Sequence, residues 1–245
     1  IEEANGAFFM RLGMEQKKVP RLAIKTAVEK RAREQEIDIS TRARYKEVEE
    51  IIIDELVGKA FPEQSSMMAY IDASKGWLVV DDTSEKKAST LTAVLRKTLG
   101  TLPVIGFAPQ VELPMVMTHW VRSGLPSEHF AFLDEVELKE QKEEGGTARY
   151  KGLSLESREI QQNLESSEDH WQVVRLGLIY DELVTFSLGE DFILKRLRYL
   201  DGFQEQLELS DDQNAVAQSN AFLQVDTFRN LVSDLYNLCY DRENE

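Results

Sequence analysis

Three carboxylates and one lysine are the residues whose chemistry could cleave a phosphodiester bond. Asp81 and Asp82 follow a predicted strand, and Glu137-Leu138-Lys139 lies on another. Metal-dependent nucleases hold Mg²⁺ with carboxylates and often place a lysine near the attacking water. In a chain with 44 acidic residues, however, such a pattern arises easily by chance. Asp81 and Asp82 are more simply explained as the polar end of a hairpin strand.

Other catalytic signatures are missing from the sequence. There is no Walker loop and no GxGxxG, so neither ATP nor a dinucleotide is implied. His119, His129 and His170 are scattered without HExxH or HxH spacing, which argues against a histidine metal site. Cys239 is the only cysteine, so an internal disulfide framework is excluded and a reducing cytoplasm is the simplest location. We therefore expect no cofactor and no metal ion.

Phosphate binding by lysine and arginine is the second kind of chemistry to consider. The net charge of −15 argues against a protein that simply coats DNA. Between residues 17 and 46, however, ten basic residues stand against four acidic ones, a net charge of +6. Such segregation permits one positive surface on an acidic body. The alternative is a solvated helical face stabilised by i,i+4 pairs such as Lys25/Glu29 and Lys30/Glu34.

Further basic residues occur later in the chain. Arg96 and Lys97 lie in the last turn of a predicted helix, where cations also suit the helix dipole. Arg149 and Lys151 share one face of a predicted hairpin strand, beside its exposed tip. Each pair could contact phosphate, and for Arg96 and Lys97 the helix end alone is a sufficient explanation.

The predicted strand over residues 192–199 carries three more cations. Strict alternation places Lys195 on one face and Arg196 with Arg198 on the other, where they either pair with acidic neighbours or meet phosphates. Basic residues are not interleaved with aromatics as in single-strand stacking platforms, and no helix-turn-helix or zinc-finger spacing is present. Any DNA contact is therefore expected to be made to phosphates without strong sequence preference.

Apolar periodicity and turn residues predict the elements that must position these side chains. The order favours an α+β fold with antiparallel sheets. The first two helices are expected to form an antiparallel pair, charged outside and apolar within. Predicted strands cover 7–12, 67–73, 76–81, 103–107, 134–140, 147–151, 173–180, 183–188, 192–199 and 221–225, and predicted helices cover 22–35, 85–99, 114–121, 156–164, 227–240 and a segment capped near Thr41 that reaches Ala60.

Two blocks of sequence resemble the RdgC family of bacterial recombination-associated proteins. They are Leu95-Arg96-Lys97-Thr98-Leu99-Gly100-Thr101-Leu102-Pro103-Val104 and Thr118-His119-Trp120-Val121-Arg122-Ser123-Gly124. Further matches follow in the same order, at Asn5-Gly6, Lys59-Ala60-Phe61, Met67-Met68 with Ile71-Asp72, Leu133-Asp134-Glu135, Gly145-Gly146 and Leu194-Lys195-Arg196-Leu197. The resemblance therefore spans nearly the whole chain.

The resemblance implies a homodimeric ring with a positively charged hole that admits duplex DNA and limits access by the RecA recombinase. It also implies antiparallel sheets with flanking helices and a protruding helical pair. The expected regions are 1–16 with 62–125, a basic helical pair at 17–61 that makes the dimer contact, and 126–245 with a finger hairpin at 134–151. Family members carry about 50–60 residues before the Asn5-Gly6 match, and their absence here indicates a truncated chain or partial gene with an exposed sheet edge.

Residue by residue, the resemblance assigns Phe61 to the aromatic contact that closes the ring; the alternative is an ordinary core phenylalanine at a helix end. Arg149 and Lys151 match the family's basic finger, although Gly152 and Leu153 stand where relatives can carry a further lysine and a polar residue. The residues expected to contact DNA are Lys25, Arg42, Arg96, Lys97, Arg122, Arg149, Lys151, Lys195, Arg196 and Arg198.

Three functions remain open from the sequence. The first is a non-enzymatic, dimeric, sequence-independent duplex-DNA-binding regulator of RecA-dependent recombination in the bacterial cytoplasm and nucleoid. The second is a metal-dependent exonuclease, which would shorten DNA only with Mg²⁺. The third is a protein-interaction module that uses the acidic surface and does not bind DNA. No membrane partner is expected, because no apolar run approaches the ~18 residues that span a bilayer.

Overall fold

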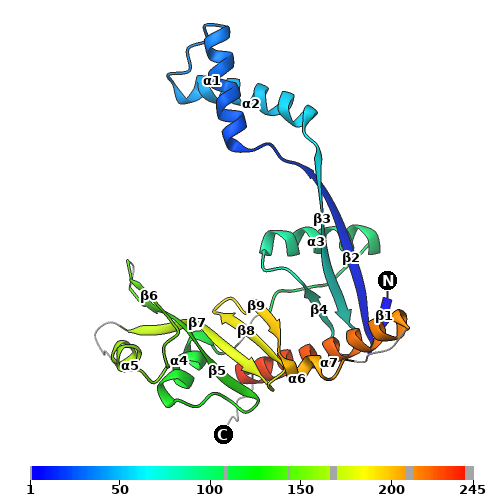
Figure 1. Ribbon diagram of the computed structural model, residues 1–245, viewed down its shortest axis with the longest axis vertical. Coiled ribbons are helices and arrows are strands. Elements are labelled where there is room, and N and C mark those ends of the chain that lie inside the picture. The colour runs from blue at the N-terminus through cyan, green and yellow to red at the C-terminus, as the bar shows by residue number, and fades with distance from the viewer. Residues whose placement is uncertain (1, 108–109, 143, 166–169, 208–211, 241–245) are drawn as a thin grey trace. The chain divides into compact units, whose positions relative to one another are not determined.

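Two antiparallel sheets and seven helices make up the part of the chain that the computed structural model describes, residues 2–107, 110–142, 144–165, 170–207 and 212–240 (Figure 1). The expected α+β class with antiparallel sheets is therefore confirmed. The chain forms two compact units. The smaller unit comprises Met10–Tyr70 with Val79–Asp81, and the larger unit comprises Ile1–Phe9, Ile71–Leu78 and Asp82–Glu245.

A four-stranded sheet in the order β1-β2-β3-β4 is built from the first strands. Its members are β1 (Glu2–Ala4), β2 (Ala7–Lys17), β3 (Pro62–Asp72) and β4 (Trp77–Val80). β2 and β3 both extend beyond the predicted apolar runs, and the added residues are largely exposed. Because these parts of the strands bury little apolar surface, hydrophobic patterning could not reveal them.

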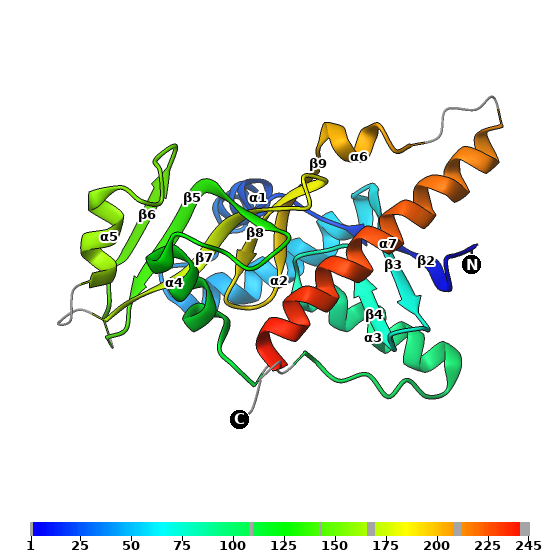
Figure 2. The same cartoon turned by 90° about the horizontal axis from the view of Figure 1, so that it is seen from below.

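Two helices cap the end of the β2–β3 ribbon in the smaller unit (Figure 1). They are α1 (Arg21–Glu34) and α2 (Arg42–Lys59), and the Thr41 side chain caps α2 by accepting a hydrogen bond from the Arg44 N–H. Figure 2 views α1 end-on while α2 lies across it, so the helices cross steeply and the expected antiparallel arrangement is wrong. The fully buried contact is limited to Val28, Val48 and Ile52, which forms a crossing point instead of a long seam.

A five-stranded antiparallel sheet in the order β6-β5-β7-β8-β9 forms the centre of the larger unit. Its strands are β5 (Phe130–Glu140), β6 (Thr147–Lys151), β7 (Trp171–Tyr180), β8 (Val184–Gly189) and β9 (Leu194–Tyr199). The predicted hairpin of β5 and β6 and the three consecutive strands that follow are confirmed. This sheet carries most of the basic residues singled out in the second half of the chain.

One face of this sheet packs against helices to form the main core. The helices are α4 (Leu113–Ser123), α5 (Arg158–Glu165) and α7 (Gln213–Tyr240), while α3 (Glu85–Leu99) and the short α6 (Asp201–Gln204) complete the unit. The buried cluster includes Val136, Leu138, Leu176, Leu178, Phe186 and Leu188 from strands and Met117, Trp120, Ile160, Leu164, Leu231 and Leu235 from helices. The opposite face is free of this apolar packing.

Two predicted strands are wrong. Residues 221–225 lie inside α7, because a five-residue apolar run does not distinguish a strand from one face of a long helix. Residues 103–107 form no strand in the structure, and Ile105 among them is exposed.

A buried ion pair ties α7 to the first sheet. Arg229 Nε lies 2.7 Å from Asp72 Oδ2, and Arg229 also donates a hydrogen bond to the Asn5 carbonyl. No helix in the described ranges is long and apolar enough to cross a membrane.

Candidate nucleic-acid interface

The solvent-facing side of the five-stranded sheet gathers charged side chains from four strands. We call it the polar face, defined by Glu135, Glu137 and Lys139 of β5, Arg149 and Lys151 of β6, Arg175 of β7, Thr185 and Ser187 of β8, and Lys195 and Arg198 of β9. The strand register sets this grouping. Glu137 lies opposite both Arg149 and Arg175, while Ser187 lies opposite Lys195 and Thr185 opposite Arg198.

A bulge in β9 overturns the predicted distribution of its cations. Thr185 and Ser187 are two residues apart on β8 and so share a face, but their partners Arg198 and Lys195 are three apart on β9. The extra residue is accommodated where Arg196 adopts a left-handed φ of 56°. Lys195 and Arg198 therefore lie on the same face, and the prediction that they face opposite ways is wrong.

Carboxylates hold several of these cations in place. Arg149 forms an ion pair with Glu137, in which its Nε and Nη2 atoms each lie 3.1 Å from a carboxylate oxygen. Arg196 reaches Glu135 on β5, and Lys195 Nζ lies 3.5 Å from Asp191 Oδ2. Each arginine pair uses only part of the guanidinium, which carries five N–H donors.

Lys151 and Arg198 complete the positive surface. Both are exposed, and neither makes an ion pair with a described residue. Lys151 lies opposite Glu135 on β5, whose carboxylate is already engaged by Arg196. The polar face thus combines positioned arginines with cations that retain their charge for a ligand.

Sequence reasoning missed Arg175 and Ser187, which lie in the middle of the polar face. Arg175 Nε and Ser187 Oγ are buried without a hydrogen-bond partner in the described structure, and Ser187 is only 3% exposed. Buried polar atoms are normally paired, so these two are unsatisfied hydrogen-bonding groups within the layer of the polar face. The sequence signal was weak: one arginine within the apolar run of β7, whose face is set by a bulge relative to β5.

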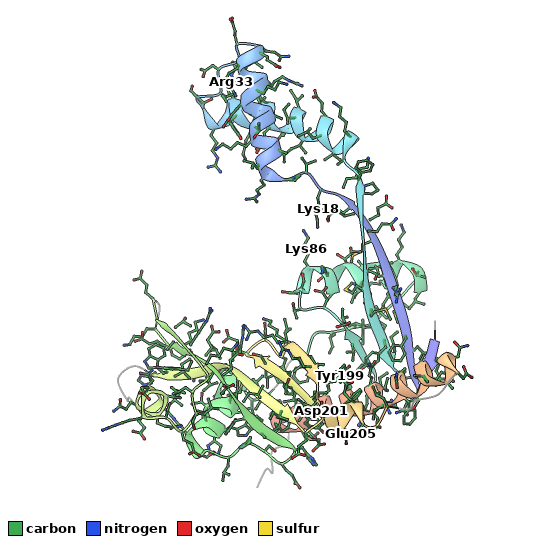
Figure 3. All side chains as sticks on the ribbon, viewed as in Figure 1. Lys18, Arg33, Lys86, Tyr199, Asp201 and Glu205 are labelled. Atoms are coloured by element: carbon green, nitrogen blue, oxygen red, sulfur yellow. The ribbon has the colours of Figure 1, made fainter. Side chains whose placement is uncertain are left out.

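The helical pair of α1 and α2 carries the other predicted cations. Figure 3 labels Lys18 just beyond the end of β2 and Arg33 near the end of α1. Lys25 Nζ lies 3.9 Å from Glu29 Oε1, so the i,i+4 pairing proposed as the alternative is present. Arg42, the first residue of α2, is exposed. The basic charge here is spread over exposed helical surfaces.

One arginine of the helical pair has a structural role. Arg31 donates to both carboxylate oxygens of Glu55, at 3.0 and 2.6 Å, and so joins α1 to α2. These hydrogen bonds hold the pKa of the Glu55 carboxyl below its usual range. This cation is therefore committed to the fold of the pair.

Arg96, Lys97 and Arg122 come from helices and do not belong to the polar face. Arg96 Nε donates a hydrogen bond of 3.3 Å to the carbonyl of Leu102, which lies in the segment that follows α3. The Arg122 guanidinium donates to the Leu164 carbonyl and so links α4 to α5. Lys97 is exposed in the last turn of α3. Local structural roles thus account for two of these three residues.

Two of the three carboxylates considered for a nuclease site, Asp82 and Glu137, are engaged in other ways. Asp82 accepts hydrogen bonds from Lys87 Nζ at 2.6 Å and from the Ser84 N–H at 2.8 Å, and these contacts lower its pKa. Glu137 is bound to Arg149. Within the described ranges, no three His, Cys, Asp or Glu side chains are grouped so that they could hold a metal ion.

Phe61 comes after Ala60, the C-cap of α2, and is 90% exposed. The alternative reading of an ordinary core phenylalanine at a helix end is therefore wrong. A large aromatic side chain in water suits contact with another molecule. The role at a dimer interface remains a prediction.

Comparisons with known proteins agree with the resemblance seen in the sequence. Residues 1–240 match the family model RdgC, described as "Putative exonuclease, RdgC". The chain is 33% identical over 221 residues to proteins named "Recombination-associated protein RdgC" from Salmonella typhimurium, Salmonella typhi and Salmonella agona. Each alignment covers 89% of this chain and 72% of the relative. The chain therefore belongs to the RdgC family of recombination-associated proteins.

Proposed function

We propose that this protein binds duplex DNA through its phosphates, without sequence preference, and thereby modulates RecA-dependent recombination in the bacterial cytoplasm and nucleoid. The observation that carries the proposal is the polar face. Cations from β6, β7 and β9, distant in sequence, share one sheet surface on a protein with a net charge of −15. A focused positive surface of this kind attracts a polyanion while the acidic remainder repels it.

The chemistry of the polar face favours phosphate contact over base reading. The side chains that define it are charged or small and polar, and none is aromatic. Stacking platforms for single strands require exposed rings, and base reading requires an element that enters a groove. Arginine forks and lysines can instead take the place of counterions along a duplex, which makes binding strong at low salt and insensitive to sequence.

A homodimeric ring around the duplex is the assembly that we propose. The exposed Phe61 supports it, because an aromatic side chain in water gains free energy when a second copy covers it. The helical pair at 17–61, with Lys25 and Arg42, would lie at this contact, and the finger hairpin with Arg149 and Lys151 would lie near DNA. Arg96, Lys97, Arg122, Lys195, Arg196 and Arg198 complete the proposed DNA-contacting set.

The test is duplex binding by fluorescence anisotropy across a salt series. We expect log K to fall linearly with log salt, and duplexes of different sequence to give the same curve. A double variant, Arg149→Gln with Arg198→Gln, should flatten the slope by about 1.8, because each lost phosphate contact removes ~0.9. The proposal is wrong if duplex binding is undetectable at low salt.

An exonuclease is the second candidate, because the matching family model names that activity in its description. The same titrations with and without Mg²⁺, followed by denaturing gels, separate the two. Intact DNA in both arms supports a binding protein. Shortening that occurs only with Mg²⁺ and is lost in Asp81→Asn or Glu137→Gln would establish the nuclease instead.

A further inference from the structure

We propose that the cavity between α4 and the start of β7 binds a single deoxynucleotide, with its base against an indole and its phosphate near one arginine and two imidazoles. The cavity has a volume of about 290 Å³. Its lining residues are Met115, Thr118, His119, Arg122, His170, Trp171 and Gln172. Apart from Arg122, these residues play no part in the proposed duplex contact, so the inference goes beyond it.

The α4 wall is built from one side of the helix and is firmly held. Met115, His119 and Arg122 follow each other at i, i+4 and i+7, which places them on one face. Thr118, which is buried, accepts a hydrogen bond from the Val173 N–H at 2.9 Å and so fixes α4 to β7. Arg122 uses one donor for the Leu164 carbonyl and has others available, since a guanidinium carries five N–H groups.

The opposite wall adjoins the base of the β5–β6 hairpin. Trp171 pairs in register with Glu140, and a Cβ atom at Gly146 would lie 3.4 Å from Trp171 Cη2. The indole is therefore confined by the hairpin. His170 has a left-handed φ of 44°, and its carbonyl accepts a hydrogen bond from the Gln141 N–H at 3.3 Å.

The side chains of the cavity select the class of ligand. They offer a guanidinium, two imidazoles, a carboxamide and an indole, and the described lining has no carboxylate although the chain holds 44 acidic residues. Cationic and neutral donors suit a phosphate, and an indole suits the flat face of a base. The two histidines alone fall short of the three protein ligands of a zinc site.

The size of the cavity limits the ligand to one nucleotide. Small-molecule sites usually span about 300–1,000 Å³, and this cavity, at about 290 Å³, lies just below that range. The same chemistry is present in a free deoxynucleoside monophosphate and in the unpaired terminal nucleotide of a DNA strand. The experiment must therefore distinguish these two sources.

The three histidines of the chain provide a built-in probe. Two of them, His119 and His170, line the cavity, and His129 does not. We expect titration with deoxyadenosine monophosphate to shift the imidazole NMR signals of His119 and His170 and to leave that of His129 in place. Equal shifts at all three, or no shift at millimolar nucleotide, would overturn the proposal.

Calorimetric titration of the intact protein measures the selectivity. Deoxyadenosine monophosphate should bind at least tenfold more tightly than deoxyadenosine or inorganic phosphate, because only the nucleotide uses both the indole and the cations. His119→Asn should weaken the nucleotide about fivefold, while the matched control His129→Asn should leave it unchanged. Equal affinity for inorganic phosphate would show an unspecific anion site and sink the idea.

A competition experiment identifies the source of the nucleotide. A hairpin duplex with one unpaired 5′-phosphorylated nucleotide is compared with the same hairpin closed at both ends. Displacement of deoxyadenosine monophosphate by the open hairpin alone assigns the cavity to strand ends, and displacement by neither assigns it to free nucleotide. Displacement by both hairpins would contradict a one-nucleotide site. Binding of the mononucleotide is read without any duplex, so failure of the duplex-binding proposal would be seen separately.

Discussion

The polar face and the helical pair are both rich in cations, but the two regions hold them in different ways. Cations of the polar face come from strands whose register is fixed by hydrogen bonds and backed by a buried cluster of twenty residues. Those of the helical pair stand on two helices joined through a buried cluster of three, Val28, Val48 and Ile52, and by the Arg31–Glu55 pair.

The difference teaches that an excess of charge along a sequence is not the same as a positive surface. The helical pair stands out in the sequence because its lysines and arginines are concentrated in one stretch, yet helical geometry spreads them over several sides. The polar face is hardly visible in the sequence, because its members come from five strands. Strand pairing then places them in one layer, where they can meet a single ligand.

The largest expected effect concerns how firmly each region is folded. Ile52→Ala should cost about 2–5 kcal/mol, which is enough to unfold the helical pair, because so few other buried contacts remain. Leu138→Ala, a matched change in the larger core, should cost a similar amount and leave its sheet folded. Hydrogen exchange followed by mass spectrometry should show fast exchange confined to residues 21–59 in Ile52→Ala. Faster exchange throughout the chain would mean that the two units unfold together.

Removal of cations from each region gives the next largest effect. Arg149→Gln with Arg198→Gln on the polar face should weaken duplex binding by about tenfold or more at low salt, because two phosphate contacts are lost. Lys25→Gln with Arg42→Gln in the helical pair should weaken it by less, since these side chains are not held in one layer. Anisotropy titrations compare the two double variants directly. The reverse order would move the main DNA contact to the helical pair.

Removal of a carboxylate should act in the opposite direction, and less strongly. Glu137→Gln frees the Arg149 guanidinium and removes a charge that repels phosphate, so duplex affinity should rise about threefold. Glu29→Gln removes the partner of Lys25 in α1 and is the matched control, for which we expect little change. The salt dependence of both variants should be recorded, because the gain for Glu137→Gln should shrink as salt screens the face. Equal gains in the two variants would show a general charge effect.

The smallest expected effect concerns how the stability of the folded protein depends on pH. His129 Nδ1 lies 2.7 Å from Asp181 Oδ1, and this contact raises the pKa of His129 above its usual 6.5. A raised pKa means that the stabilisation is fully present below about pH 6.5 and is lost as pH rises through the folded value. Asp181→Asn, which suits the left-handed φ of 47° at this position, should remove that dependence.

The measurement is the melting temperature of both proteins at pH 5.5 and pH 9. The wild type should exceed Asp181→Asn slightly at pH 5.5, and the gap should close at pH 9. An unchanged gap at both pH values would contradict a stabilising role for His129.

Asp38, in the smaller unit, has the opposite pH dependence. Its pKa is lowered chiefly by the hydrogen bond from the Ser40 N–H. Its contribution to the stability of the fold is therefore present above pH 3.8 and is lost in acid.

Much of the fold was open to prediction because its elements bury regular apolar faces. The strands β7, β8 and β9 and the helices α3 and α4 were all placed within a few residues. Prediction failed where burial is slight, as in the outer parts of β2 and β3, and where a short apolar run was ambiguous, as at residues 221–225. Exposed ribbons and helical segments of this kind carry little hydrophobic signal.

The candidate site was harder to predict than the fold. Arg149 and Lys151 could be assigned to one face from alternation alone, whereas Lys195 and Arg198 could not, because a bulge interrupts β9. Arg175 was missed for a similar reason. The cavity combines residues from α4 with residues at the start of β7, and only tertiary packing brings His119 and His170 together.

The bulge at Arg196 lets β9 hold one extra residue without turning its faces over. Side chains along a strand have two-residue parity, and one extra residue reverses that parity for everything that follows. The bulge absorbs that residue, so deleting Arg196 would leave Lys195 and Arg198 on one face at the regular two-residue spacing. Tyr199, whose ring stacks on Phe203 of α6 with centroids 4.2 Å apart, would keep its side of the sheet. Figure 3 labels Tyr199 beside the first residue of α6. The same residues in a strand without the bulge would send Lys195 and Arg198 to opposite faces, so this one backbone irregularity determines where the second cation lies.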